Sequence, residues 1–588
     1  MFLIAALPSY LIRFSVFGVP STLLEAMILI AFAVWVIANL HQIVDNLKLK
    51  IKLLKNPKSE IRNPKSERYP FDIEIILLLI ISFIAVAVAG FSDSALGIWK
   101  AYFFEPILVF ILVMNVFGEF SVGAQKFAPL RKILWPLAVS AFAVSVFAIY
   151  QKFTGVFIFN ELWAVEETRR VVSFFGYPNA VGLYLGPMAM VMIGFFLHEI
   201  KKIQDTRYKI QTNSKLQIPN NKHLTACKAG IPNLKFQITN PATSRSLSRK
   251  QRGDNGAGKL QISKIIFIAT VIFLSLLSIY FAKSEGALIG AAAGLAVFGL
   301  LAGKRARWAV ITLIFIAGLG IIMSQPVRNY AVKKITLADL SGEIRKQQWI
   351  ETWQMMANSP SRFIFGIGLA NYKKVILPYH QEGIFFNKDN NPDFRRKIVI
   401  FDDQYKAEHW QPVEIYLYPH NIFLNFWTEL GIAGMLLFVW VVVKFFIVGI
   451  RIIKFQISNF KSPVLSNKYL ILGLIGSMAV IVIHGLVDVP YFKNDLAVMF
   501  WLLIAMLGLI NLNNKKLCAT KKTIKFSLFN SLGTLAYVGA VSWFISNGDK
   551  IFGKMSGYLA PVAFLLLFVI SAAITGILVL GKPALLFL

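Results

Sequence analysis

The chain has 588 residues, of which 56% are hydrophobic, 15% are charged and 50 are phenylalanine. Soluble domains carry about 25% charged residues, so this composition excludes an ordinary soluble enzyme. The net charge of +31 would suggest nucleic acid in a soluble protein, but here the basic residues lie in loops between apolar runs and indicate membrane topology. The chain has two cysteines, Cys227 and Cys518, and both lie in basic loops that we place in the cytoplasm. The sequence therefore predicts neither a disulfide framework nor a metal cluster.

Apolar runs close to the roughly 20 residues that cross a bilayer recur along the chain. We expect membrane spans at residues 23–40, 75–91, 102–117, 134–151, 179–197, 265–282, 286–302, 308–324, 431–450, 469–486, 495–512, 528–545 and 557–579. The predicted fold class is an all-α integral membrane protein, a polytopic helical bundle of about 12–14 transmembrane helices with one large external loop. The apolar start, residues 1–20, contains Pro8 and Pro20 and lacks a basic first segment. It is therefore interpreted as a half-span or shortened first helix rather than a cleaved signal peptide.

Basic residues are concentrated in alternate connections, which predicts the orientation of the chain. By the positive-inside rule these connections are cytoplasmic, and they comprise residues 41–73, 118–133, 198–264, 303–307, 451–468 and 513–525. The predicted organisation is N-terminal helices in 1–324 with cytoplasmic insertions at 41–73 and 198–264, an extracytoplasmic loop at 325–419, C-terminal core helices in 420–512 and an extra hairpin in 513–588.

The long connections differ in composition. Residues 56–67 repeat the pentapeptide Asn-Pro-Lys-Ser-Glu, and 201–264 is rich in Lys, Asn, Gln and Ser. We expect both to be disordered, with attraction to anionic lipids as the alternative. The loop 325–419 instead mixes charges of both signs with aromatic residues such as Trp349 and Trp410, and it is far longer than a typical connection. We expect this loop to fold.

Histidine is the side chain best suited to acid or base chemistry near neutral pH, and the chain has seven. His420 stands out because it ends the external loop in Tyr418-Pro-His-Asn-Ile-Phe, directly before a predicted span. At that depth its side chain meets water on one side and lipid headgroups on the other. A histidine that merely caps the following helix is the alternative interpretation.

Arginines form the second group of candidates. Arg169 and Arg170 lie on the predicted outer side, against the positive-inside trend, and Arg345 lies early in the external loop. A guanidinium group is a planar, permanently charged fork that suits phosphate oxygens. Bases on the disfavoured side therefore indicate an anionic headgroup at the outer leaflet, with snorkelling to lipid phosphate as the alternative.

These and other landmarks occur in a definite order along the chain. They are Arg170-Val-Val-Ser-Phe-Phe-Gly-Tyr-Pro-Asn179, Lys283-Ser-Glu-Gly-Ala287, Arg345 with Trp349, Gly366-Ile-Gly-Leu-Ala-Asn-Tyr372, Pro419-His-Asn421 with Glu429-Leu-Gly431, and His484-Gly-Leu-Val-Asp488. Their order and predicted membrane side resemble the O-antigen ligase and polymerase superfamily over residues 7–512. Members of that family are integral membrane glycosyltransferases that move a glycan from undecaprenyl diphosphate to an acceptor hydroxyl at the outer face of the cytoplasmic membrane.

The resemblance implies a role for each matching residue. Arg170 and Arg345 would hold the diphosphate, and His420 would act at the acceptor hydroxyl. Substrate-binding roles are implied for Arg169, Lys283, Trp349, Tyr372 and Asn421, and supporting roles around His420 for Glu429, His484, Asp488 and Asn179. The implied partners are the lipid-linked donor, a glycan, lipid or protein hydroxyl, and membrane lipids. No cofactor or metal is implied, and no nucleic acid.

Some of these residues keep a second interpretation. Many relatives have Ser-Arg-Gly where this chain has Ser284-Glu285-Gly286, so either Lys283 replaces the missing positive charge or that contact is absent. The small-residue helix that follows is more typical of close helix packing than of a lipid groove. Glu429, His484 and Asp488 fit structural hydrogen-bond partners as well as a shell around His420.

Two further motifs are interpreted as structural. Asn179 follows Pro178 at a predicted helix start. Gly366-Ile-Gly-Leu resembles part of a nucleotide-binding loop, but no strand precedes it and no third glycine stands in register, so we reject a dinucleotide site.

The remaining alternatives concern the acceptor and the class of protein. Within the family, a ligase, an O-antigen-type polymerase and a protein O-oligosaccharyltransferase fit the sequence equally. A polytopic transporter or lipid flippase is the rival from another class, followed by a non-enzymatic envelope scaffold. Transporters place ionisable residues or broken helices near the membrane midplane, whereas here the charged residues gather at span ends. Lys444 is the main exception.

Overall fold

The computed structural model of the protein describes residues 1–16, 19–41, 44–45, 70–118, 128–216, 242–400, 402–458, 467–515, 537–542, 545–546 and 571. The predicted span 557–579, most of the span 528–545, and much of both predicted insertions lie outside the described residues.

The first half of the chain forms helices almost throughout. Its elements are α1 (Phe2–Ala5), η1 (Leu7–Leu11), β1 (Arg13–Val16), β2 (Val19–Thr22), α2 (Leu23–Ala38), α4 (Asp72–Val88), α5 (Asp93–Trp99), η2 (Lys100–Phe104), α6 (Glu105–Gly118), α7 (Ala128–Thr154), α8 (Glu161–Ala164), α9 (Pro178–Leu216), α10 (Ala242–Phe281) and α11 (Glu285–Ala302). In α5, η2 and α6 one continuous helical path passes through a π-helical turn at η2.

The second half adds the remaining spans and the elements between them. These are α12 (Lys304–Met323), α13 (Gln325–Ile335), α14 (Leu340–Ala357), α15 (Pro360–Phe365), α16 (Tyr372–Val375), η4 (Leu377–Tyr379), β3 (Gly383–Phe385), α17 (Phe394–Val399), α18 (Asp403–His409), β4 (Trp410–Pro412), α19 (Ile422–Ser458), α20 (Lys468–His484) and α21 (Asn494–Lys515). The predicted all-α polytopic membrane fold is confirmed. Among the described residues, eight helices are long and apolar enough to cross a membrane.

The apolar start differs from its prediction. Instead of one half-span or shortened helix, it contains α1, η1 and the antiparallel hairpin β1–β2, in which Arg13 pairs with Thr22. Thr22 then caps α2, because its hydroxyl accepts from the Glu25 amide at 3.1 Å while Glu25 accepts from the Thr22 amide. Glu25 also pairs with Lys100 at 2.6 Å. Pro8 and Pro20, which lack amide donors, fit the 3-10 turn and the hairpin better than a continuous helix.

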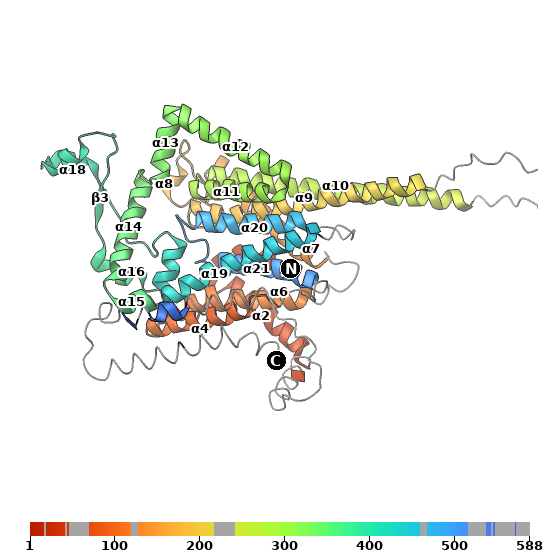
Figure 1. The fold of residues 1–588 in the computed structure, drawn as a ribbon, viewed down its shortest axis with the longest axis horizontal. Helices are drawn as coiled ribbons and strands as arrows, with labels where there is room; N and C mark the ends of the chain where they lie inside the picture. Colours follow the sequence, from red (N-terminus) through yellow and green to blue (C-terminus); the bar gives the residue numbers. More distant parts are fainter. Residues whose placement is uncertain are drawn as a thin grey trace, which may run out of the picture.

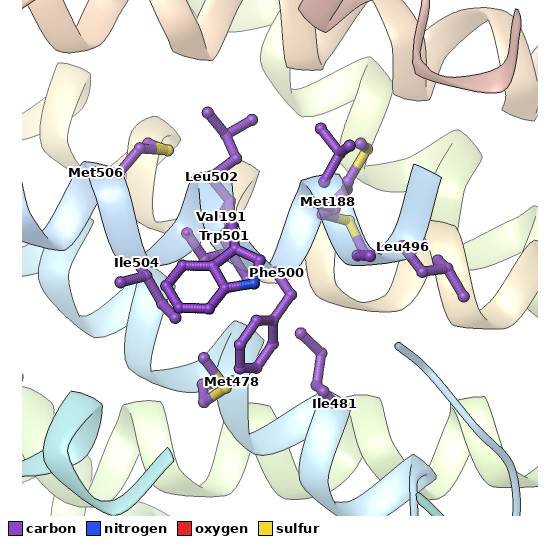
Figure 2. Close-up of a cluster of buried hydrophobic side chains, with 14 of the residues drawn as sticks. Met188, Val191, Met478, Ile481, Leu496, Phe500, Trp501, Leu502, Ile504 and Met506 are labelled. Atoms are coloured by element: carbon purple, nitrogen blue, oxygen red, sulfur yellow. The ribbon is translucent and has the colours of Figure 1, made fainter. Parts of the chain in front are cut away.

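The core of the bundle forms where α9, α11, α20 and α21 pack together. Figure 2 shows its side chains converging from α9, α20 and α21, among them Met188, Val191, Met478, Ile481, Phe500 and Trp501. The backbones of α9 and α20 touch, since a Cβ on Gly194 would lie 2.8 Å from the Gly473 Cα. Glycine at both positions permits this approach, as is typical of helix pairs in membranes. The small-residue face of α11 is likewise a packing surface, because a Cβ on Gly290 or Gly294 would meet Val480 of α20.

The two long connections on either side of the bundle core lie at opposite ends of the molecule. In Figure 1, α14 to α18 gather at one end, while α9 and α10 extend beyond the other. The loop 325–419 folds, as predicted, into short helices and the strand pair β3–β4. The predicted disorder of 201–264 is wrong at both margins, because α9 continues to Leu216 and α10 begins at Ala242.

The rejected nucleotide motif proves to be a packing motif. Gly431 interrupts α19 with φ +74° and ψ −179°, a conformation essentially restricted to glycine. Gly366 lies against this kink, since a Cβ on it would be 2.7 Å from the Gly431 amide nitrogen. The Ile367 amide donates to the Thr428 carbonyl at 2.7 Å. The kink therefore joins the external loop to α19, the helix that directly follows His420.

We expect Gly431→Ala to destabilise the protein by about 1–3 kcal/mol, because alanine is strained in this backbone conformation and its Cβ would also press on α15. Gly320→Ala in α12 is the matched control, since a Cβ there meets nothing within 4 Å. Thermal unfolding in detergent measures both. Equal melting temperatures for the two variants would contradict this account of the kink.

Candidate active site

A cavity of about 190 Å³ lies beside α14, at the end of the bundle where the external loop folds. Its α14 wall consists of residues at helical spacing, which places them on one face of the helix; the opposite wall comes from the segment that precedes α19. The lining residues are Leu340, Ser341, Ile344, Arg345, Tyr416 and His420. Two of the predicted site residues, Arg345 and His420, therefore face the same cavity.

His420 is held from three directions. Its Nδ1 lies 2.9 Å from Oε1 of Gln348 on α14. Its ring contacts Tyr416 edge-on, with centroids 4.7 Å apart, and Tyr418 at 4.9 Å. Its backbone φ is +46°, an uncommon value for a non-glycine residue. A left-handed residue held by this many contacts is typical of a functional position.

The surroundings of His420 favour the neutral imidazole. Burial lowers its pKa from the usual 6.5. The carboxylate of Asp488 opposes this shift, and the positive charge of Arg345 adds to it. Because a charged imidazolium loses hydration on burial, His420 is neutral at pH 7 and can accept a proton.

Arg345 spans from α14 to the segment after α20. Its Nε donates to the Val487 carbonyl at 3.0 Å, and its Nη1 donates to the Ser341 hydroxyl at 2.6 Å. These bonds hold the guanidinium against the cavity wall. Arg345 and His420, 75 residues apart in the sequence, meet because α14 lies against the segment that leads into α19.

Arg170 lies in the connection before α9 and reaches the turn that follows α10. Its Nε donates to the Ala282 carbonyl at 3.1 Å, and its Nη2 lies 3.4 Å from Oδ1 of Asn179 and from the Lys283 carbonyl. Burial lowers the pKa of Arg170, and the charge of Glu285 opposes that shift. Arginine nevertheless stays protonated at any physiological pH.

Asn179 connects the two arginine regions. Its Nδ2 donates to Oδ2 of Asp488 at 3.3 Å, while its Oδ1 accepts from Arg170. Asp488 directly follows Val487, whose carbonyl holds Arg345. Arg170 does not line the cavity described above, and this chain of hydrogen bonds joins it to the residues that do.

Neither guanidinium is neutralised by a carboxylate among the residues that the structure describes. Arg170 and Arg345 donate to carbonyl, amide and hydroxyl oxygens, all of which are uncharged. Glu285, the acidic residue nearest in sequence to Lys283, pairs instead with Lys334 of α13 at 2.7 Å. Guanidinium groups without a paired carboxylate are suited to attract an anion.

Arg169 and Lys283, which were predicted to bind substrate, contact backbone carbonyls instead. Arg169 donates to the carbonyls of Ala164 and Lys152. The Lys283 ammonium donates to the Thr168 carbonyl, so the structure does not place it as a substitute for the missing arginine. We leave both residues out of the proposed site.

Tyr372 and Asn421 serve the fold. Tyr372 is 1% exposed and shares a 2.7 Å hydrogen bond with Thr352 in a small second core. Asn421 caps α19, since its Oδ1 accepts from the amides of Phe423 and Leu424. Neither placement supports a contact with substrate.

The residues predicted to surround His420 divide into two groups. Asp488 and Asn179 belong to the network around the arginines. His484 is buried against α11, where a Cβ on Gly286 would lie 2.7 Å from its ring. Glu429 is buried in α19 and accepts from the Ala370 amide at 3.2 Å. The last two fit their structural interpretation.

Sequence reasoning missed Gln348, Tyr416 and Tyr418. Gln348 follows Arg345 by three residues, so helical periodicity alone places both on one face of α14. The tyrosines stand four and two residues before His420, but no local pattern indicates that a left-handed turn folds the histidine ring onto them. Within the described residues, no three His, Cys, Asp or Glu side chains could hold a metal ion.

Trp349 fixes the segment before His420, because its indole Nε1 donates to the Pro419 carbonyl at 2.8 Å. We expect Trp349→Phe to lose about 0.5–1.5 kcal/mol of stability through that hydrogen bond and to loosen the cavity. Trp353→Phe, one turn later on α14 at a 55% exposed position, should change stability less. Thermal unfolding and limited proteolysis near Pro419 compare the two, and indistinguishable variants would argue against the hydrogen bond.

The comparison with protein families identifies part of the chain. Residues 270–439 match the family model described as O-antigen ligase, from within α10 to within α19. The match contains Arg345 and His420, whereas Arg170 precedes it and Asp488 follows it. No curated protein matches the chain. Over these residues, and in its helical membrane fold, the chain is similar to the O-antigen ligase family.

Proposed function

We propose that the protein transfers an oligosaccharide or polysaccharide from undecaprenyl diphosphate to an acceptor hydroxyl at the outer face of the cytoplasmic membrane. One observation carries this proposal. Two arginines without carboxylate partners among the described residues lie at the same end of the bundle as a neutral histidine that faces a cavity. The family match supplies the glycan chemistry.

Arg170 and Arg345 suit the donor. As the bond from the sugar C1 to the phosphate oxygen breaks, the diphosphate leaves with the bonding electrons and gains negative charge. Preorganised cationic donors stabilise that charge more in the transition state than in the ground state. Each guanidinium is already oriented by bonds to neutral oxygens, so little reorganisation is needed.

His420 suits the acceptor. The acceptor hydroxyl oxygen attacks C1 of the sugar, and its proton passes to the neutral imidazole. A positioned general base of this kind contributes typically about 10²- to 10⁴-fold to the rate. A single displacement inverts the configuration at C1. The guanidinium groups supply the positive charge in this proposal, so no step is assigned to a metal ion.

The positions of the long connections support the outer face. The basic segments that continue α9 and α10 lie at the end of the bundle opposite the cavity, and the positive-inside rule assigns such segments to the cytoplasm. The acceptor is a lipid-linked core sugar, the end of a second carrier-linked glycan, or a protein hydroxyl. These three correspond to a ligase, a polymerase and a protein O-oligosaccharyltransferase.

The transporter interpretation loses its main support. Lys444, the basic residue deepest in a predicted span, pairs with Glu74 at 2.6 Å and lies over the Phe71 ring. The pair also receives the Trp440 indole N–H at 2.9 Å. Because Glu74 satisfies the charge of Lys444, this lysine is accounted for by a contact between α4 and α19 and does not by itself indicate a transport path.

Reconstitution in liposomes with a carrier-linked oligosaccharide and a panel of acceptors tests the proposal, with products identified by mass spectrometry. We expect transfer with and without EDTA. His420→Ala should abolish it, and Arg170→Ala and Arg345→Ala should each reduce it at least about 100-fold. Lys346→Ala is the matched control, because Lys346 neighbours Arg345 yet pairs only with Glu343 among the described residues. Wild-type transfer by His420→Ala would refute the assignment of the base.

The lowered pKa of His420 predicts the pH dependence of transfer. A base must be neutral to accept a proton, so the rate should fall as the pH drops through the pKa of His420, with a midpoint below 6.5. Asp488→Asn should move this midpoint further down, because the carboxylate raises the pKa. Initial rates measured from about pH 4 to about pH 9 at saturating donor test this. A midpoint above 6.5 would contradict it.

A further inference from the structure

Gln348 makes two hydrogen bonds that together orient it. The residue lies on α14, three positions after Arg345, and is 5% exposed. Its Nε2 donates to the Tyr418 carbonyl at 3.0 Å, and its Oε1 lies 2.9 Å from Nδ1 of His420. Rotating the amide by 180° would place two oxygens against each other at Tyr418. The Tyr418 carbonyl therefore decides which atom of Gln348 faces the histidine.

This orientation assigns the proton of the imidazole. An amide oxygen can only accept a hydrogen bond, so Nδ1 of His420 must carry the hydrogen that it accepts. A neutral imidazole has one N–H, and its lone pair is then on Nε2. No hydrogen bond to Nε2 comes from any described residue, and His420 lines the cavity.

We propose that Gln348 is a positioning residue, which holds His420 in the tautomer whose Nε2 accepts the proton of the acceptor hydroxyl. This inference rests on the proposed function, because it concerns the same proton transfer. Gln348 acts through His420 and does not touch the reacting atoms. The step balances: the hydroxyl proton moves to Nε2, the imidazolium carries the charge, and its Nδ1–H stays on the Gln348 oxygen.

The packing of α14 supports this role. Gln348 and the next residue, Trp349, donate to the consecutive carbonyls of Tyr418 and Pro419. The helix thus fixes the two residues before His420 and the ring of His420 itself. The φ of +46° at His420 turns its side chain back toward α14, where Gln348 receives it.

Other charged and titratable groups face His420. Arg345 approaches from α14 and Asp488 from the segment after α20, and they shift its pKa in opposite directions. Tyr416 and Tyr418 contact the ring, and Glu414 acts on Tyr416. These groups stay in place in the variants below, so differences between the variants report the atom that replaces Oε1.

The test compares Gln348→Leu and Gln348→Glu in the liposome assay with a carrier-linked oligosaccharide as donor. Gln348→Leu removes the acceptor of the Nδ1 hydrogen. We expect kcat to fall about 10- to 100-fold, the range found when a metal-ligating histidine loses the hydrogen-bond partner that orients it. KM for the donor should stay unchanged. Gln348→Glu keeps an acceptor at this position, so activity should persist at high pH. Its carboxylate also stabilises the imidazolium, so the acid midpoint should move to higher pH.

Gln347→Leu is the matched control. Gln347 is the neighbouring residue on α14 and donates to Glu351 at 3.0 Å, away from His420. It should retain wild-type kcat and pH profile.

Three results would overturn the inference. Wild-type kcat and acid midpoint in Gln348→Leu would show that no orientation by Gln348 is needed. Equal losses at every pH in the Leu and Glu variants would show that Gln348 only fills space. A donor KM raised with kcat unchanged would place it in binding. His420→Ala separates the two proposals: if it is inactive while Gln348→Leu is normal, the proposed function stands and this inference fails.

Discussion

The contact between α14 and the segment that leads into α19 holds the site together. Two side chains of α14 donate to the consecutive carbonyls of Tyr418 and Pro419, and the same helix contributes Arg345 to the cavity wall. Buried carbonyls need partners, and here they obtain them from a helix about 70 residues earlier in the chain. The same contact places the Arg345 guanidinium and the His420 imidazole on opposite walls of one cavity.

Charge separation is the second organising feature. Asp488 joins the arginine network through Asn179, which hydrogen-bonds to both Asp488 and Arg170. An amide at this position connects the two residues while preventing a direct ion pair, in which the guanidinium would be neutralised. On α13, Lys334 binds both Glu285 and Asp339, so two further carboxylates are occupied by a lysine. In the proposed function, the guanidinium groups are therefore available to the diphosphate of the donor.

Two glycines allow the backbone of the external loop to pack closely against the membrane spans. Gly366 touches α19 at its kink, and Gly368, with φ +80°, lies against the end of α4, where a Cβ would be 2.6 Å from the Ala89 amide nitrogen. Two glycines separated by one residue thus bring the segment directly after α15 against two different spans. Because backbone contacts leave little room for sliding, the folded loop keeps a defined position over the bundle. The cavity depends on that position, since its α14 wall belongs to the loop and its His420 wall leads directly into a span.

The membrane fold and most of the spans could be predicted from the sequence, because bilayer crossing imposes a long apolar run and a charge asymmetry that are readable locally. Arg345 and His420, also singled out in the sequence, both line the cavity. It could not show that Tyr372 and Asn421 are structural, because burial and capping depend on neighbours distant in the chain. It also missed the helical margins of 201–264 and the hairpin at the start. The contact between Gln348 and His420 is visible only in the folded chain, because it joins residues 72 positions apart and depends on a carbonyl that no sequence pattern reveals.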